Sequence, residues 1–223
     1  MRSGLSTSIR RHVPARALAL AGVLIAGALV AATPLEAAAS TSYGVNLVQN
    51  SGAESGLKHW ETFPDPGFLT VKYGASGLGY PSKSASKHIG GGKHFFTAGQ
   101  YDNTFNTCPD AQQQIDLSGI GSAIDSGHVK VSLSGYAGTN GAADINAHLD
   151  LYFRDIQNHP VANNGFTKNA SSTNEQYKHI TASKVLPKHT RILRVHLWAD
   201  GGSTVTGGCQ AFWDNISVVL KHV

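Results

Sequence analysis

The chain has 223 residues, with 18 lysines and arginines, 14 aspartates and glutamates, and a formal net charge of +4 at pH 7. Four of the arginines and Glu36 lie in the first 39 residues, so the remainder holds 14 basic and 13 acidic residues, a net charge of +1. Because nucleic-acid binding requires a marked excess of basic residues, we expect no nucleic-acid partner.

The first 39 residues are typical of an export signal. Arginines at positions 2, 10, 11 and 16 precede an apolar run at residues 17–32, and three alanines at 37–39 follow it. The run is shorter than the roughly 20 residues that a membrane-spanning helix needs. We therefore predict a signal peptide over residues 1–39, a secreted or cell-envelope location, and no membrane span in the mature chain. An uncleaved N-terminal anchor is the alternative.

A short linker is expected at residues 40–44, and no later segment shows a sustained helical period. Short runs rich in β-branched and aromatic residues alternate instead with clusters of Gly, Pro and Asn. We predict surface loops at residues 74–92 and 158–174, and strands at residues 45–49, 68–73, 93–98, 112–117, 128–136, 145–153, 176–186, 191–199 and 211–220. This spacing predicts an all-β protein, an antiparallel β-sandwich or jelly roll, with one domain over residues 45–223. We expect a monomer.

Cys108 and Cys209 are the only cysteines of the chain. In an exported protein, two cysteines favour one disulfide over a metal-binding pair or two separate thiols. The enclosed loop of about 100 residues would contribute roughly 4–5 kcal/mol to stability in the chain-entropy model.

Three of the predicted strands alternate so regularly that the side of each side chain can be read from the sequence. In residues 128–136, 144–154 and 191–200, apolar side chains point one way and polar or aromatic side chains the other. If the three strands share a sheet, its outer face suits a sugar, because aromatic rings stack on pyranoses while Asp, His and Arg bond hydroxyls. This predicted face consists of Tyr136, His148, Asp150, Tyr152, Arg194, His196 and Trp198. The alternative is the ordinary polar outer face of a sandwich.

Catalytic readings of the same residues are less favoured. Ser132 or Ser134 with His148 and Asp150 would mimic a nucleophile–base trio, but strand alternation alone produces such neighbours. The chain has no Gly-x-Ser-x-Gly motif. Asp144 and Asp150, a candidate glycosidase pair, lie roughly 20 Å apart along one strand. We therefore predict no catalytic residues and favour a non-enzymatic protein.

Motifs near both ends of the chain point to one family. The opening run has Asn46, Leu47, Asn50, Gly52, Glu54, Gly56, Leu57 and Trp60, and the closing strand has Phe212, Asp214 and Ile216. Residues 113–118, Gln-Gln-Ile-Asp-Leu-Ser, match a central strand. These motifs resemble the jelly-roll carbohydrate-binding modules with a galactose-binding-like fold, of the cellulose- and xylan-binding type. Two departures are Ala53, where the family usually has Phe, and Asn215, where it has a second acid.

The resemblance implies a structural calcium ion held by Glu54, Asp214 and backbone carbonyls. Hard oxygen ligands and glycine-rich turns suit calcium. The alternative is that the two carboxylates only accept hydrogen bonds from backbone amides. In either case, we expect Glu54 to meet Asp214 and Trp60 to pack in the core.

Three classes of function follow from the resemblance. We favour a secreted, non-catalytic protein that binds a polysaccharide or glycan through one face of the sandwich. The alternatives are an extracellular structural or interaction protein that binds no sugar, and a small polysaccharide hydrolase or lyase. The sequence does not identify the glycan.

Overall fold

The computed structural model describes residues 42–65, 67–76, 79–99, 107–141, 145–170, 177–200 and 209–223. The predicted signal peptide at residues 1–39 lies outside the described residues. Within these ranges, no helix is long and apolar enough to cross a membrane.

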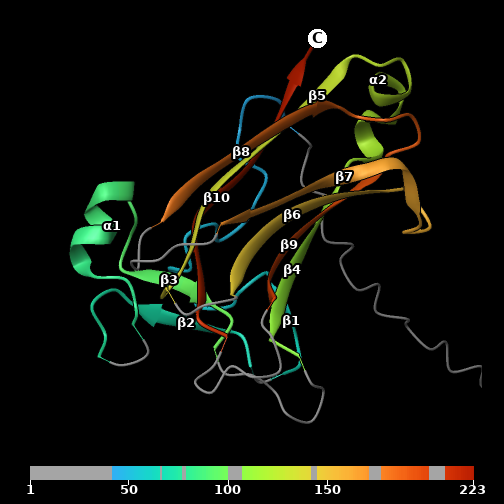
Figure 1. Cartoon of the computed structure of the whole chain (residues 1–223). Coiled ribbons are helices and arrows are strands. Elements are labelled where there is room, and N and C mark those ends of the chain that lie inside the picture. Colours follow the sequence, from blue (N-terminus) through green and yellow to red (C-terminus); the bar gives the residue numbers. More distant parts are fainter. Residues whose placement is uncertain are drawn as a thin grey trace, which may run out of the picture. The chain divides into compact units, whose positions relative to one another are not determined.

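Ten strands of the described chain form two five-stranded antiparallel sheets (Figure 1). The first, named the β6 sheet here, has the order β1-β4-β9-β6-β7, and the second, the β10 sheet, has the order β2-β3-β10-β5-β8. The β6 sheet comprises β1 (Glu61–Phe63), β4 (Asp110–Asp116), β9 (Ile192–Asp200), β6 (Asn146–Arg154) and β7 (Pro160–Ala170). The β10 sheet comprises β2 (Leu69–Lys72), β3 (His94–Thr97), β10 (Ala211–His222), β5 (Val129–Thr139) and β8 (Lys178–Val185). The short helices are α1 (Lys83–Ile89), η1 (Ser118–Ile120) and α2 (Gly121–Asp125).

The core consists of side chains that alternate along the strands and point between the two sheets. Fully buried apolar side chains include those of β5 (Val129, Val131, Leu133), β6 (Leu149, Leu151, Phe153) and β9 (Leu193, Val195, Leu197). Burying each such side chain contributes roughly 1.5–3 kcal/mol. Trp213 of β10 is also fully buried, and its Nε1 donates to the carbonyl of His148, 2.9 Å away, on β6 of the other sheet. The predicted all-β jelly-roll sandwich is confirmed.

The opening run of the domain differs from its prediction. Residues 45–49 form no strand but a single bridge between Asn46 and Val219 of β10. The Asn46 side chain makes two further hydrogen bonds to the backbone of β10. Its Oδ1 accepts from the amide of Val218, and its Nδ2 donates to the carbonyl of Ile216. Trp60 lies in the core as predicted, 7% exposed, with its ring tilted against Phe96.

The two predicted surface loops contain regular structure. Residues 158–174 include β7, which pairs with β6 through its backbone although its side chains are mostly polar. An outermost strand that leaves its side chains exposed lacks the apolar alternation on which the prediction relied. Residues 74–92 contain α1, whose N-terminus is capped by the Ser82 hydroxyl, which accepts from the amide of Ala85, and whose C-terminus is capped by Gly90 with φ +64°. Helices of two turns leave little periodic signal in a sequence.

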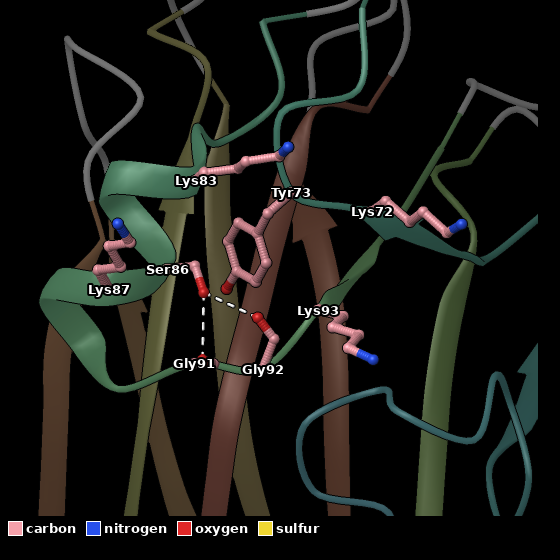
Figure 2. A pocket seen from close by; sticks show the side chains of 8 residues that line it. All are labelled: Lys72, Tyr73, Lys83, Ser86, Lys87, Gly91, Gly92 and Lys93. Carbon is pink, nitrogen blue, oxygen red and sulfur yellow. Dashed lines mark hydrogen bonds between the residues drawn. The ribbon is translucent and has the colours of Figure 1, made fainter.

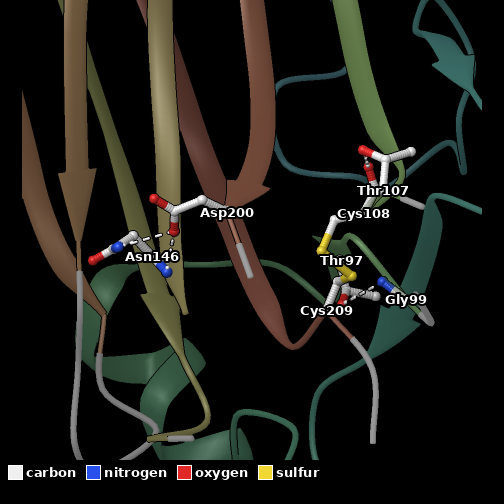
Figure 3. Close-up of a disulfide and its surroundings, with 7 residues drawn as sticks. All are labelled: Thr97, Gly99, Thr107, Cys108, Asn146, Asp200 and Cys209. Carbon is white, nitrogen blue, oxygen red and sulfur yellow. Dashed lines mark hydrogen bonds between the residues drawn. A yellow bond between two sulfur atoms is a disulfide. The ribbon is translucent and has the colours of Figure 1, made fainter. Parts of the chain in front are cut away.

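The predicted disulfide is present and joins Cys108 to Cys209, 101 residues apart in sequence (Figure 3). Cys108 lies just before β4 of the β6 sheet, and Cys209 lies just before β10 of the β10 sheet. The bond therefore connects the two layers of the sandwich covalently.

Candidate functional site

Six of the seven residues predicted to bind a glycan lie together on the β6 sheet. Adjacent strands β6 and β9 pair His148 with Trp198, Asp150 with His196, and Tyr152 with Arg194. Directly opposed residues on neighbouring strands place their side chains side by side on one face. The register therefore brings the six side chains into three consecutive rows, as the alternation predicted.

Tyr136 does not belong to this face. Its strand, β5, pairs with β8 and β10 and so lies in the other sheet. There the Tyr136 ring stacks on His179, with ring centroids 4.7 Å apart. The prediction was wrong because alternation shows on which side of its strand a residue points, but not which sheet the strand joins.

The rings of four residues form a continuous line, named the aromatic row here: His148, Trp198, His196 and Tyr152. His148 stacks on Trp198 with centroids 3.9 Å apart and planes 13° apart. The ring centroids of Trp198 and His196 are 6.3 Å apart with planes at 17°, and those of His196 and Tyr152 are 6.1 Å apart with planes at 43°. Arg154 completes the row, since its guanidinium carbon lies 5.6 Å from the centroid of the Tyr152 ring.

Asp150 lies fully buried among these rings. Its Oδ2 accepts hydrogen bonds from the hydroxyl of Tyr152 and from Nε1 of Trp198, both at 2.7 Å. Burial, together with the bond to the Asp150 carboxylate, raises the pKa of Tyr152 to about 12. The other carboxylate oxygen is buried and has no hydrogen-bond partner among the described residues. Asp150 thus fixes the orientation of two rings of the row.

His148 lies against Asp200. Its Nε2 lies 3.0 Å from Oδ2 of Asp200, whose Oδ1 accepts from the backbone and side-chain amides of Asn146 (Figure 3). Burial acts to raise the pKa of Asp200, but the neighbouring His148 and the hydrogen bonds from Asn146 outweigh it and lower that pKa. Both rings of the His148–Trp198 stack therefore contact a carboxylate: His148 lies against Asp200, and Trp198 donates to Asp150.

The polar rim of the aromatic row includes residues that the sequence analysis left out of the predicted site. On β4, Gln112 lies opposite His196 and Gln114 opposite Arg194. Asp110 Oδ1 is 3.5 Å from Nε2 of His196. Alternation along residues 110–116 was a signal that could have placed these side chains on the outer face.

A second group of interest joins the opening turn to the closing strand. Glu54 Oε1 accepts from the amides of Lys93 and His94, at 2.7 and 2.8 Å. Asp214 is fully buried, and its two oxygens accept from the hydroxyl of Tyr73 at 2.5 Å and from the amide of Asn215 at 2.7 Å. Both carboxylates therefore make the hydrogen bonds of the calcium-free alternative.

The charge of this group nevertheless suits a cation. Burial raises the pKa of Asp214 to about 6, against hydrogen bonds from Tyr73 and Asn215 that lower it, and the negative charge of Glu54 raises it further. In the part of the chain that the structure describes, no lysine, arginine or histidine pairs with Asp214.

The donor set also limits what such a cation could be. No three His, Cys, Asp or Glu side chains converge anywhere in the described ranges, so a bound ion would need backbone oxygens as well. A side chain at Gly91 would come within 2.5 Å of Asp214 Oδ2, and one at Gly92 would overlap Glu54. The α1–β3 connection therefore lies directly against both carboxylates. Two carboxylates with carbonyls in glycine-rich turns fit calcium.

Comparison with known proteins identifies the fold. No protein-family model matches the sequence, and no curated protein matches it. A solved structure of TmCBM61 in complex with β-1,4-galactotriose is similar to this chain, with 12% identity and a TM-score of 0.51 over 80% of this chain and 99% of that one. The enzymatically active domain of tailspike protein 4 from bacteriophage CBA120 is also similar, with 14% identity and a TM-score of 0.52 over 79% of this chain.

The extent of these matches differs. The chain spans nearly all of the carbohydrate-binding module but only 22% of the tailspike chain. At such low identities the likeness concerns the fold alone. The protein therefore has the jelly-roll β-sandwich fold of carbohydrate-binding modules, as the motifs at its two ends predicted.

Proposed function

We propose that the protein is a secreted, non-catalytic module that binds a polysaccharide or glycan along the aromatic row. The observation that carries this proposal is the continuous line of rings on the outer face of the β6 sheet, flanked by Arg154 and Arg194. The fold shared with a module whose structure contains β-1,4-galactotriose supports the proposal.

The geometry suits a sugar chain in two ways. The C–H faces of a pyranose pack on aromatic rings, and the guanidinium groups supply planar donors to its hydroxyls. Because Asp150 already holds Tyr152 and Trp198 by hydrogen bonds and Asp200 lies against His148, binding would cost little side-chain ordering. Asp150 serves in this proposal as a positioning residue, since it holds Tyr152 and Trp198 from beneath.

One observation favours a second candidate, an extracellular interaction protein that binds no sugar. His148 covers one face of the Trp198 ring at a centroid distance of 3.9 Å, so that face is not available for stacking on a ligand. A sugar would have to use the edge of Trp198 together with His196 and Tyr152. Binding measurements separate the two candidates.

Trp198→Ala is the decisive substitution, because it removes the central ring of the row and one donor to Asp150. We expect the affinity for the bound glycan to fall about tenfold or more. The glycan is identified on an array and by retention on insoluble polysaccharides, and its affinity is measured by titration calorimetry. Tyr136→Ala is the matched control, since it removes a ring from the outer face of the other sheet.

Two results would contradict the proposal. Wild-type protein that binds nothing on the array or on any polysaccharide would favour the interaction protein. Equal affinity of the wild type and Trp198→Ala would move the site away from the aromatic row. Release of reducing or unsaturated ends would establish the hydrolase or lyase instead.

We also propose that Glu54 and Asp214 hold a structural calcium ion. Its role would be to join the opening turn, the α1–β3 connection and β10, which these two carboxylates already contact.

A further inference from the structure

A pocket of about 410 Å³ opens between α1, the end of β2 and the start of β3 (Figure 2). β2 is the outermost strand of the β10 sheet, so this pocket and the aromatic row belong to different sheets. The lining consists of Lys72, Tyr73, Lys83, Ser86, Lys87, Gly91, Gly92 and Lys93. Half of these residues are lysines.

The positive charge of the pocket is not balanced at its lining. No acidic residue lines it. Among the described residues, none of the four lysines forms an ion pair. Two carboxylates, Glu54 and Asp214, lie against Gly92 and Gly91, and their oxygens accept hydrogen bonds from backbone amides and from Tyr73. Four like charges around one hollow repel one another, and a bound anion would relieve this repulsion.

The local structure keeps the pocket open. Gly91 and Gly92 contribute no side chains, and the Ser86 hydroxyl fixes the loop by donating to both of their carbonyls, at 3.1 and 2.9 Å. The aliphatic part of Lys83 lies over Gly74, whose φ of +75° favours glycine. Figure 2 shows Lys83 next to Tyr73, Lys72 and Lys93 on one side of it with their nitrogens directed outward, and Lys87 on α1.

We propose that this pocket binds an anionic sugar residue, one that carries a carboxylate or sulfate group. Its volume falls within the roughly 300–1,000 Å³ of small-molecule sites and exceeds what a single inorganic anion fills. Mobile ammonium groups bind an anion as point charges, while their methylene stems and Tyr73 provide apolar surface for a sugar ring. The proposal does not depend on ligand binding at the aromatic row, because the two sites share no residue.

The test uses trigalacturonate as the probe and its uncharged methyl ester as the matched neutral ligand. We expect trigalacturonate to shift the amide resonances of Lys72, Lys93 and Gly92 in heteronuclear NMR spectra, and the ester to leave them unchanged. The triple variant Lys72→Gln, Lys83→Gln, Lys93→Gln keeps two methylenes of each side chain and removes three charges. Its affinity for trigalacturonate should fall at least tenfold.

A second triple variant controls for the loss of net charge. Lys58, Lys168 and Lys188 are exposed and do not line the pocket, so replacing all three by glutamine should leave the affinity within about twofold. Equal weakening in both triple variants would overturn the proposal, as would the absence of shifts at the pocket. Inorganic sulfate that binds as tightly as trigalacturonate would overturn the sugar assignment. The amide shifts of Lys72, Lys93 and Gly92 report on the pocket itself, which separates a failure here from a failure of the aromatic row.

Discussion

Replacing Cys108 and Cys209 by alanine should lower the free energy of unfolding by about 4 kcal/mol. The disulfide closes a loop of 101 residues and joins the two sheets, so its removal greatly increases the conformational freedom of the unfolded chain. Both cysteines are buried, at 6% and 1% exposure, so alanine is a better replacement than a hydroxyl residue that would lack a partner.

Urea unfolding of the wild type and the double variant measures this difference. Reductant provides the control, because it should bring the wild type close to the stability of the double variant and leave the variant itself unchanged. A difference below about 1 kcal/mol would show that the loop-entropy argument fails for this fold.

The thermal stability of the calcium-free protein should fall as the pH rises from 4 to 6. The folded protein keeps the Asp214 proton up to a pKa of about 6, whereas the unfolded chain loses it near 3.8. Between these values the folded state binds more protons, so raising the pH favours unfolding. The full difference corresponds to about 3 kcal/mol.

Asp214→Asn should abolish this pH dependence, because asparagine retains an acceptor for the amide of Asn215 and has no proton to lose. The comparison of the variant with the wild type isolates Asp214 from the histidines and the other carboxylates. At pH 7 without calcium, the variant should be at least as stable as the wild type, since it buries no charge.

Calcium should reverse the order of the two proteins at pH 7. It binds the charged carboxylates, so it should raise the thermal midpoint of the wild type, by about 2–4 °C per kcal/mol of binding free energy. Below pH 5 protons compete for Asp214, and the calcium effect should disappear. Scans in chelator and in calcium from pH 4 to 8 provide both tests. Identical scans in chelator and in calcium would contradict the calcium proposal. A flat pH profile in chelator would show that the pKa of Asp214 is not raised.

Much of the fold could be predicted because it depends on alternation and on turn residues. The side of each residue on β6 and β9 followed from strict alternation, which a buried face imposes. The strand β7 could not be predicted, since its exposed side chains leave no apolar pattern, and α1 is too short to show a helical period. Which sheet β5 joins depends on pairing between distant segments, which alternation within one strand does not show. Tyr136 was therefore predicted on the wrong sheet.

The candidate site was predicted as a set of residues but not as an arrangement. Alternation predicted that Asp150 and Trp198 share one face. It did not predict the hydrogen bond between them or the burial of the Asp150 carboxylate beneath the rings. The lysine-lined pocket was missed for a related reason. Lys72, Lys83 and Lys93 belong to β2, α1 and the approach to β3, and only the packing of these elements brings them together.

The single bridge of Asn46 has a practical consequence for producing the protein. Along one edge of β10, β3 pairs only with Phe212 and Trp213. Further along the same edge, residues 44–47 form the hydrogen bonds to residues 216–220. This short segment covers backbone groups that would otherwise offer a template for pairing with another chain. A recombinant domain that starts after residue 47 would therefore risk aggregation, and an expression tag belongs before residue 43.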